Sequence, residues 1–380
     1  MEAFTITHKD KETNARIGII NTKKHSIETP FFMPVATKAA AKHLNSKRLE
    51  ELGARAVISN SMILHFRPGD KIIRKLGGIG KFMNYSGINV TDSGGFQMYS
   101  DSIYISSNEK GVFFRNPFSG EKILMTPEKN MEIQINIGSE IAMCLDSMPL
   151  YDKSKEDIEK AVKQTILWAK RCKQEHDKLQ KNTEKEKRQL LFGISQGGIY
   201  EDLRKQSIVE LKKLDFDGYS IGGLGLGETF EEEMKIVNLQ KSIIPENKPI
   251  YLMGIGNPPE ILEAISFGVD MFDSRMPTQS ARRGTLFTSK GKLKILNKKY
   301  ETDKNPIDKN CDCFACKNYS RAYIKFLLSQ EEPVGKELAS YHNLAYLQNL
   351  IKEAKKHIKE GTFKEFKEKI KKAYEKDTSR

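Results

Sequence analysis

The sequence predicts an α/β fold, and within that class it favours a (β/α)8 TIM barrel over an open, doubly wound sheet. Three observations support this prediction. Short apolar runs alternate with longer amphipathic stretches up to about residue 275, there are eight such runs, and polar or glycine residues end most of them. Near-continuous apolar strands that alternate with helices are typical of parallel strands buried on both faces.

The eight apolar runs each have the length of a strand, and helical patterns separate most of them. Helical spacing is clearest in Ile158–His176, Glu201–Lys213 and Glu231–Lys241, where apolar residues recur at every third or fourth position. The charged segment Lys170–Arg188 is expected to be a solvated helix end and loop. The predicted strands are Pro30–Thr37, Ala54–Asn60, Ile88–Asp92, Ile141–Asp146, Leu190–Gln196, Gly218–Gly223, Pro249–Gly254 and Val269–Asp273.

The residues at the C-terminal ends of these strands are the first candidates for a functional site. In a barrel of this kind the C-terminal rim holds the active site, whereas an open sheet would not naturally gather all the strand ends at one place. Three carboxylates there can divide the roles of nucleophile, acid/base and substrate anchor. Spacing alone does not assign these roles, and a single Asp is more often a cap or turn former. The strand-end residues are Asp92, Asp146, Gln196, Gly223, Gly254 and Asp273.

Glycine-rich and basic segments follow three of the strands. Gly222–Gly227 does not match the dinucleotide pattern G-x-G-x-x-G, so it is interpreted as a tight loop that allows close backbone approach. Ser93–Gly95 can present backbone N–H groups to a ligand. The basic stretch Arg275–Arg283 follows the last strand, where it fits a phosphate-binding role, although neighbouring arginines commonly just face solvent.

Composition points to a polyanionic partner. The 380 residues include 63 Lys and Arg against 50 Asp and Glu, a formal net charge of +13. Such an excess favours nucleic acid, because phosphate contacts release counterions, but a generally lysine-rich composition would explain it equally well. Because no long apolar stretch and no hydrophobic leader occur, we expect a cytoplasmic protein without a membrane partner.

Three of the five cysteines lie within six residues, a density that suits a metal better than disulfides. Cys311, Cys313 and Cys316, with His342 further along, would supply four tetrahedral ligands to zinc. A full set of four protein ligands favours a structural site over a catalytic one. The alternative is a group of incidental buried cysteines, and the other two cysteines are interpreted as packing residues.

Five short motifs, taken together and in order, resemble the tRNA-guanine transglycosylase family. The resemblance extends from about Thr29 to the C-terminal helices, and the cysteine and histidine set also has the family's spacing. The motifs are Thr91–Gln97 (TDSGGFQ), Gly193–Gly197 (GISQG), Gly222–Leu224 (GGL), Tyr251–Gly254 (YLMG) and Asp270–Asp273 (DMFD).

The resemblance implies a reaction at the wobble guanosine of GUN-anticodon tRNAs, in queuosine biosynthesis. Asp273 would attack C1′ of the nucleotide, release guanine and leave a covalent ribosyl-enzyme. Asp92 would act as general acid/base when the incoming 7-deazaguanine attacks. The family reads U-G-U in the anticodon loop with the target base extruded, and Arg282 and Arg283 would bind the tRNA. The substrate-binding residues would be Ser93, Phe96, Asp146, Gln196, Gly223, Leu224, Met253 and Gly254, with Phe96 and Met253 sandwiching the base.

The resemblance also implies one structural zinc per subunit and a homodimer. An aromatic stripe of Tyr319, Tyr323 and Phe326 follows the cysteine cluster, with Phe82 as a possible contributor from the other subunit. By spacing alone such a stripe is more often core than interface.

Five positions depart from the family pattern. Met62-Ile63 replaces a usual Tyr-His pair, and Gln279 replaces an arginine expected near the tRNA, so contacts with the partner subunit or with tRNA are affected. In the base pocket, Met148 stands where bacterial members have cysteine and Leu226 where they have valine. Queuine-using members carry glycine at the latter position, so Leu226 favours a small base such as preQ1.

The complete prediction is a (β/α)8 barrel with a zinc-binding subdomain and C-terminal helices. We expect the barrel with its catalytic rim at residues 1–290, the zinc-binding subdomain at 291–350 and a helical segment packing on the barrel at 351–380. Alternatives are a queuine-inserting enzyme, a base-exchange enzyme acting on another tRNA position or on DNA, and a non-catalytic RNA-binding subunit. A zinc-dependent hydrolase is disfavoured because the cysteines lie outside the eight strands.

Overall fold

An eight-stranded parallel sheet curves into a barrel at the centre of the structure, a computed structural model that describes residues 2–100, 102–148 and 153–375. The strand order is β4-β14-β13-β12-β11-β10-β6-β5, and a parallel bridge between Val35 and Ile58 joins the two end strands. Each of the eight predicted runs overlaps one barrel strand, so the predicted fold class is confirmed. The strands are β4 (Phe31–Pro34), β5 (Ala56–Asn60), β6 (Ile88–Asp92), β10 (Ile141–Met143), β11 (Leu190–Ser195), β12 (Gly218–Ile221), β13 (Ile250–Leu252) and β14 (Met271–Ser274).

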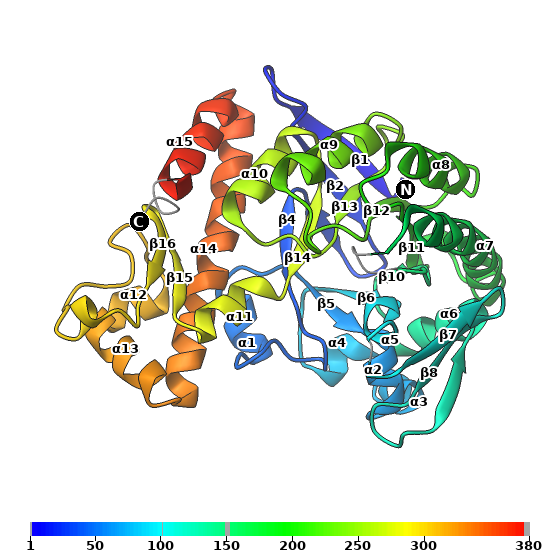
Figure 1. Cartoon of the computed structure of the whole chain (residues 1–380), viewed down its shortest axis with the longest axis horizontal. Coiled ribbons are helices and arrows are strands. Elements are labelled where there is room, and N and C mark those ends of the chain that lie inside the picture. Colours follow the sequence, from blue (N-terminus) through cyan, green and yellow to red (C-terminus); the bar gives the residue numbers. More distant parts are fainter. Residues whose placement is uncertain (1, 101, 149–152, 376–380) are drawn as a thin grey trace.

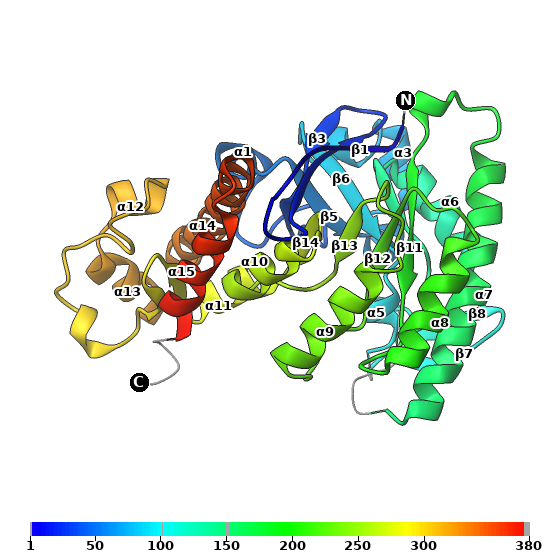
Figure 2. The same ribbon diagram turned by 90° about the horizontal axis from the view of Figure 1, so that it is seen from above.

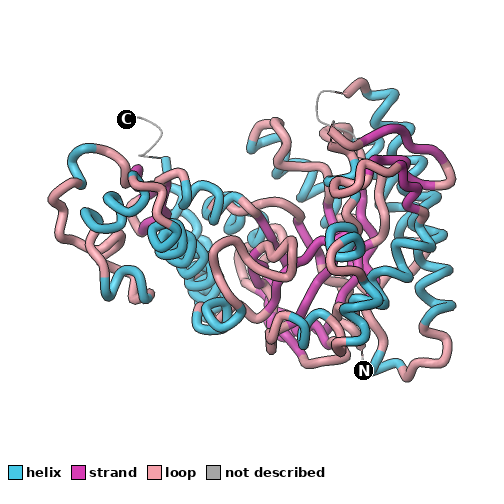
Figure 3. The backbone as a smooth tube through the Cα atoms, turned by 90° about the horizontal axis from the view of Figure 1, so that it is seen from below, coloured by secondary structure: helices cyan, strands magenta, loops and turns pink. Residues whose placement is uncertain are grey.

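Helices surround the barrel, as Figure 3 shows with strands in magenta and helices in cyan. The long α7 begins where the Ser154 side chain accepts a hydrogen bond from the Asp157 N–H, and α9 begins with a reciprocal capping box between Thr229 and Glu232. These helices are α1 (Ser46–Glu51), α2 (Ser61–Phe66), α3 (Asp70–Lys75), α4 (Ile79–Phe82), α5 (Gly95–Met98), α6 (Pro127–Ile137), α7 (Lys155–Leu179), α8 (Glu201–Lys212), α9 (Phe230–Lys241), α10 (Pro258–Ser266) and α11 (Met276–Arg282).

A small antiparallel sheet, which the sequence analysis did not predict, covers the N-terminal end of the barrel. It consists of β1 (Phe4–Lys9), β2 (Arg16–Asn21) and β3 (Ser26–Glu28). Phe4 and Ile20 belong to the same buried cluster as the side chains that fill the barrel interior. Apolar packing therefore closes the N-terminal end of the barrel.

A buried ion pair fastens this sheet to the barrel. The Arg16 guanidinium lies 2.5 Å from the Asp270 carboxylate, and both side chains are almost completely buried. The Thr29 hydroxyl donates a further hydrogen bond of 3.1 Å to Asp270. Asp270 immediately precedes β14, so the pair links strand β2 to the last strand of the barrel.

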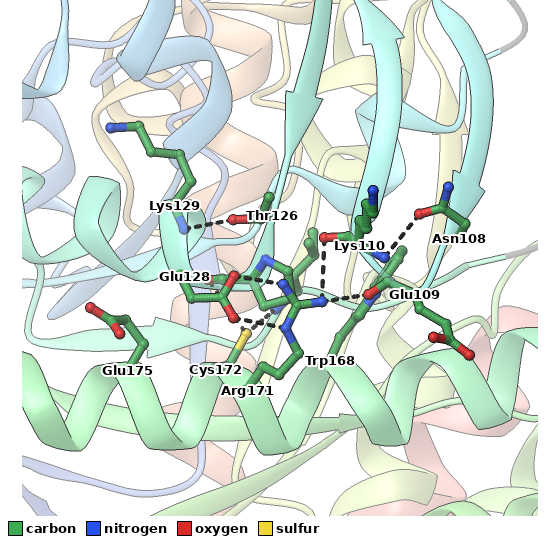
Figure 4. A network of polar contacts seen from close by, with 12 residues as sticks. Asn108, Glu109, Lys110, Thr126, Glu128, Lys129, Trp168, Arg171, Cys172 and Glu175 are labelled. Atoms are coloured by element: carbon green, nitrogen blue, oxygen red, sulfur yellow. Dashed lines mark hydrogen bonds and ion pairs between the residues drawn. The ribbon is translucent and has the colours of Figure 1, made fainter.

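A second unpredicted antiparallel sheet is inserted between α5 and α6. It contains β7 (Tyr104–Asn108), β8 (Gly111–Arg115) and β9 (Lys122–Met125). Arg171 of α7 donates two hydrogen bonds of 2.7 Å to the Glu128 carboxylate and also donates to the Glu109 carbonyl (Figure 4). The Trp168 indole N–H donates to the same Glu109 carbonyl at 3.1 Å, so α7 holds the β7–β8 turn in place.

The C-terminal part consists of a hairpin and four helices beside the barrel. Helix α14 lies against the barrel, where the Gln348 amide donates to the Phe32 carbonyl of β4 at 3.0 Å. Both α12 and α13 lie on the far side of α14 from the barrel (Figures 1 and 2). Among the described residues, none of the helices combines the length and the apolar character needed to cross a membrane. The elements are β15 (Thr285–Thr288), β16 (Gly291–Lys294), α12 (Phe314–Asn318), α13 (Arg321–Ser329), α14 (Pro333–Glu360) and α15 (Phe363–Glu375).

Candidate active site

A cavity of about 430 Å³ opens at the C-terminal ends of the barrel strands. All six strand-end residues singled out in the sequence line this one cavity, although they come from six different strands and span residues 92 to 273. Of the other candidates, Ser93, Phe96, Leu224 and Met253 line it as well. The barrel therefore brings the predicted catalytic and substrate-binding residues together.

Asp273, on β14, is held in place through only one of its carboxylate oxygens. Its Oδ1 accepts hydrogen bonds from the Tyr251 hydroxyl at 2.6 Å and from the Gly254 N–H at 3.0 Å. Burial raises the pKa of Asp273, and these two donors oppose that rise by stabilising the carboxylate. Because both bonds go to Oδ1, the second oxygen is left to act on a ligand in the cavity.

Asp92 ends β6, and its protonation is poised near neutral pH. Burial raises its pKa to about 7, and the nearby carboxylates of Asp273 and Asp146 act in the same direction. The Gly94 N–H donates to Asp92 at 2.7 Å from a left-handed backbone conformation with φ of +79°, which favours glycine at that position. A carboxyl group with such a pKa can both donate and accept a proton under physiological conditions.

Asp146 and Gln196 form a polar wall of the cavity. The Gln196 amide donates to Asp146 at 2.6 Å, and the Ser93 hydroxyl donates to the other carboxylate oxygen at 3.3 Å. Burial raises the pKa of Asp146 to about 6. A Cβ atom at Gly223 would lie 2.3 Å from the Gln196 Oε1, so only glycine allows the backbone to approach this amide. Adjacent donors and acceptors of this kind match the edge of a purine.

The cavity also has an apolar lining suited to a flat ring. Phe96 is 43% exposed, which is unusual for a phenylalanine inside a cavity, and Met253, Leu224 and Leu226 line the same space. Aromatic and sulfur-containing side chains bind a nucleobase by stacking on its π face. The cavity therefore offers stacking surfaces and hydrogen-bonding groups together.

The four predicted metal ligands meet outside the barrel. The ligand atoms of Cys311, Cys313, Cys316 and His342 lie within 4.8 Å of one another. The His342 Nδ1 is 3.8, 3.6 and 3.3 Å from the three sulfur atoms in that order. Zinc bonds of about 2.3 Å to sulfur and about 2.05 Å to nitrogen in a tetrahedron would place these atoms about 3.6 Å apart. The cluster therefore fits a tetrahedral metal site.

The orientation of His342 supports the same conclusion. Its Nε2 lies 2.7 Å from the Phe287 carbonyl, an acceptor, so this nitrogen carries the proton and Nδ1 is free to bind a metal. The neighbouring Asn343 donates to the carbonyls of Pro277 and Thr285, at 2.9 and 3.1 Å. The cluster is thus joined through α14 to the start of α11.

Comparison with known proteins agrees with this geometry. The family model described as queuine tRNA-ribosyltransferase matches residues 10–376. Relatives with that name include one from Thermoanaerobacter sp. (strain X514), 47% identical over 371 residues that cover 98% of this chain and 97% of the relative. Those from Lysinibacillus sphaericus (strain C3-41) and Fusobacterium nucleatum subsp. nucleatum are each 45% identical, with 96% and 97% of this chain covered and 94% and 98% of the relatives.

The chain belongs to the queuine tRNA-ribosyltransferase family. It is therefore an enzyme, a tRNA-guanine transglycosylase, and the resemblance stated from its motifs is confirmed.

The two arginines predicted to contact tRNA in this transglycosylase are not among the residues that line the cavity. Arg282 is in the last turn of α11, and one of its terminal nitrogens is buried without a hydrogen-bond partner among the described residues. Arg283 follows the helix and is exposed. Arg275, which was noted only as the start of a basic stretch, lines the cavity itself.

Three of the four aromatic residues expected at a subunit interface are exposed on this chain, and the fourth, Tyr319, is half-buried. Tyr323 is 44% exposed, Phe326 57% and Phe82 38%, and the rings of Tyr319 and Tyr323 stack at 5.6 Å.

Several residues that shape the site were missed in the sequence. Tyr251 was quoted within a family motif but given no role, because a tyrosine inside an apolar strand resembles a core residue. Asn130 of α6 donates to the Ser93 carbonyl at 2.7 Å, and Asn60 lines the cavity at the end of β5. Arg204 of α8 donates hydrogen bonds to the carbonyls of Gly222 and Gly223 at the cavity wall. It was missed because an arginine within a helical pattern normally indicates a solvated face.

Proposed function

We propose that this enzyme exchanges guanine at the wobble position of GUN-anticodon tRNAs for a 7-deazaguanine, with Asp273 as nucleophile. The observation that carries the proposal is the hydrogen bonding of Asp273, whose Oδ1 is held by Tyr251 and Gly254 while its second oxygen has no such partner among the described residues. That oxygen attacks C1′, the bond from C1′ to guanine breaks, guanine leaves with a proton donated by protonated Asp92, and a ribosyl ester forms. The incoming base then attacks C1′ through its ring nitrogen, and the ester bond to Asp273 breaks.

Asp92 is the general base of the second step. The incoming base loses the proton of its attacking nitrogen, and the Asp92 carboxylate accepts it. The pKa of about 7 supports this role, because both protonation states are populated at neutral pH. Asp146, Gln196, Ser93 and the backbone at Gly223, Leu224 and Gly254 bind the base edge, with Phe96 and Met253 against its faces.

We propose preQ1 rather than queuine as the incoming base. Leu226 lines the cavity and occupies space that the larger queuine side chain would need. The Gly225 N–H donates to the Glu228 carboxylate, so the preceding Leu224 carbonyl points the opposite way across a planar peptide. A carbonyl directed away from Glu228 is available as an acceptor for the amine of preQ1.

The test is incorporation of radiolabelled guanine into a GUN-anticodon tRNA. Wild type should incorporate label, Asp273→Asn should not, and Asp177→Asn, on the exposed side of α7, should match wild type. Unlabelled preQ1 should compete strongly and queuine weakly; equal competition would favour the queuine-inserting alternative. No label uptake by a folded wild type would contradict the proposal and favour a base in another tRNA position or in DNA.

Zinc in the cysteine cluster, one ion per subunit, belongs to the same proposal. The Cys311, Cys313, Cys316 and His342 set fits zinc by ligand type and geometry. Zinc would contribute folding free energy there and no step of the reaction, because the cluster lies outside the cavity. Elemental analysis of the purified protein tests both the identity of the metal and its stoichiometry.

We also propose a cytoplasmic homodimer whose interface includes Tyr319, Tyr323 and Phe326. Light scattering of wild type and Phe326→Glu measures the assembly; a monomeric wild type would contradict it.

The division into a barrel (1–290), a zinc-binding subdomain (291–350) and a C-terminal segment (351–380) is likewise proposed, and limited proteolysis tests it.

A further inference from the structure

Arg204 is a completely buried arginine behind the wall of the base pocket. It lies on α8 and has 0% exposure. Instead of a carboxylate, its guanidinium has four backbone carbonyls as hydrogen-bond partners. It donates to Gly198 at 2.7 Å, Gly222 at 2.8 Å, Ser195 at 3.2 Å and Gly223 at 3.4 Å.

All four carbonyls belong to the ends of two adjacent barrel strands. Ser195 and Gly198 flank Gln196 after β11, and Gly222 and Gly223 follow β12. The close approach depends on Gly197, where a Cβ atom would lie 2.9 Å from the Arg204 backbone nitrogen. One side chain therefore ties together the two segments that line the cavity with Gln196, Gly223 and Leu224.

The hydrogen bonds also fix the direction of the pocket's backbone donors. In a planar trans peptide the carbonyl and the following N–H point in opposite directions. Because the carbonyls of Gly222 and Gly223 point toward Arg204, the N–H groups of Gly223 and Leu224 point away from it. Both residues line the cavity, and neither N–H donates to another of the described residues.

We propose that Arg204 is a positioning residue for base recognition, which holds the Gly223 and Leu224 N–H groups as donors toward the acceptor edge of the base. This inference rests on the proposed function and extends it to a residue that does not touch the substrate. Burying a guanidinium without a direct ion pair is costly, even though the Glu228 carboxylate also favours its charged form, and a side chain needed only for packing could be apolar. Burial lowers the pKa of Arg204 to about 9, so the cation persists at neutral pH and retains all its donors.

The experiment compares Arg204→Met and Arg204→Lys with Lys205→Met, a matched control at the next, exposed position of the same helix. Guanine exchange is measured at varied guanine and at varied tRNA, with thermal unfolding recorded for each variant. Methionine leaves the four carbonyls without their donor, so we expect the KM for guanine to rise on the order of 10- to 100-fold. The KM for tRNA, to which phosphate contacts contribute most, should change less than about threefold.

Lysine should restore part of the loss, because its ammonium group keeps the charge but reaches fewer carbonyls. A guanine KM within about twofold of wild type in folded Arg204→Met would overturn the inference. So would equal losses for guanine and tRNA, which indicate general damage. If Arg204→Met does not fold, Arg204→Lys decides by the same criterion.

Hydrogen–deuterium exchange of the wild type provides a test without any variant. Guanine should protect peptides that span Gly222–Leu224, and unchanged exchange at saturating guanine would contradict the proposal. Failure of the proposed function is distinguishable, because the wild type would then incorporate no guanine into tRNA. Failure of this inference alone leaves the wild type active.

Discussion

The Tyr251 hydroxyl donates a hydrogen bond of 2.6 Å to the Asp273 carboxylate at the base of the cavity. The two residues lie on neighbouring strands, β13 and β14, whose register pairs Tyr251 with Met271. The bond holds the carboxylate in one orientation and stabilises its charged form against burial.

Tyr251→Phe should slow formation of the covalent intermediate. The variant keeps the ring and removes one donor, so Asp273 rotates more freely and its pKa rises further. Losing a hydrogen bond to a charged group costs about 1.5–3 kcal/mol, which corresponds to a rate about 10- to 100-fold lower. Single-turnover trapping of the enzyme–tRNA ester measures it. Tyr219→Phe, a buried tyrosine on β12, should be nearly unchanged, and an equal loss there would contradict the specific role of Tyr251.

Asp92→Asn should abolish activity and stabilise the fold at neutral and alkaline pH. The folded pKa of Asp92 is about 7 against a usual value of 3.8, so the native state binds a proton that the unfolded state has lost in this interval. Stability therefore falls as pH rises from about 4 to 7, and the variant escapes this loss. We expect a gain of at least ~1 kcal/mol at pH 8 that vanishes near pH 4. Thermal unfolding across this range checks it, with Asp177→Asn as a control that should show no such trend.

Removing the metal should destabilise the C-terminal part before it affects the cavity. His342→Ala deletes a ligand at the centre of α14, and chelation removes the metal itself. In either case Asn343, beside His342, no longer holds the start of α11 firmly. We expect loss of bound zinc and a Tm lower by several degrees. Cys144→Ala, which changes a buried thiol outside the cluster, should retain the metal. Zinc content and calorimetry measure both effects; an unchanged Tm in metal-free protein would contradict a structural role.

Asp270→Asn should weaken the fold by about 3–5 kcal/mol, because it leaves Arg16 as a buried charge without its counter-ion. Urea unfolding measures the change. Glu184→Gln, which breaks a fully solvated pair with Lys187, should leave the midpoint unchanged. Similar small effects for both variants would show that the buried pair does not hold the N-terminal sheet.

Arg283→Ala should weaken tRNA binding without changing the KM for guanine. The side chain is exposed at the C-terminal end of α11, where a phosphate contact would release one counterion. The dependence of log K on log salt should become shallower by about one. Filter binding at several salt concentrations checks this, with Lys187→Ala as a distant control. An unchanged salt slope would remove Arg283 from the tRNA contact.

Much of the barrel was predictable because its strands are buried on both faces and therefore appear as continuous apolar runs. The strands are shorter than predicted where the chain leaves the sheet to build the site. The run Ile141–Asp146 contains a strand that ends at Met143, and the next three residues carry Asp146 to the cavity. The polar strand ends thus predicted residues that line one cavity, while strand length was overestimated at several of the same places, such as Asp146.

The two three-stranded antiparallel sheets were missed because their strands do not appear as continuous apolar runs. Strand β7 (Tyr104–Asn108) is almost entirely exposed, and β1 buries only Phe4 fully, so neither has the apolar periodicity of a half-buried strand. Tyr251 and Arg204 were missed because their roles depend on neighbours distant in sequence. Only the closed barrel places a strand tyrosine beside Asp273, or a helical arginine behind two strand ends.

The buried pair of Arg16 and Asp270 joins positions 254 residues apart, so the ribosome synthesises Arg16 long before its counter-ion. Strand β4 emerges early, yet its ladder partner β14 is among the last elements translated before the C-terminal part. The two strands begin 240 residues apart, so at roughly 5–20 residues per second β4 is synthesised about 12–48 seconds before β14. Until then its apolar edge and the uncompensated Arg16 remain available to chaperones, so the half-made chain is the stage most exposed to aggregation.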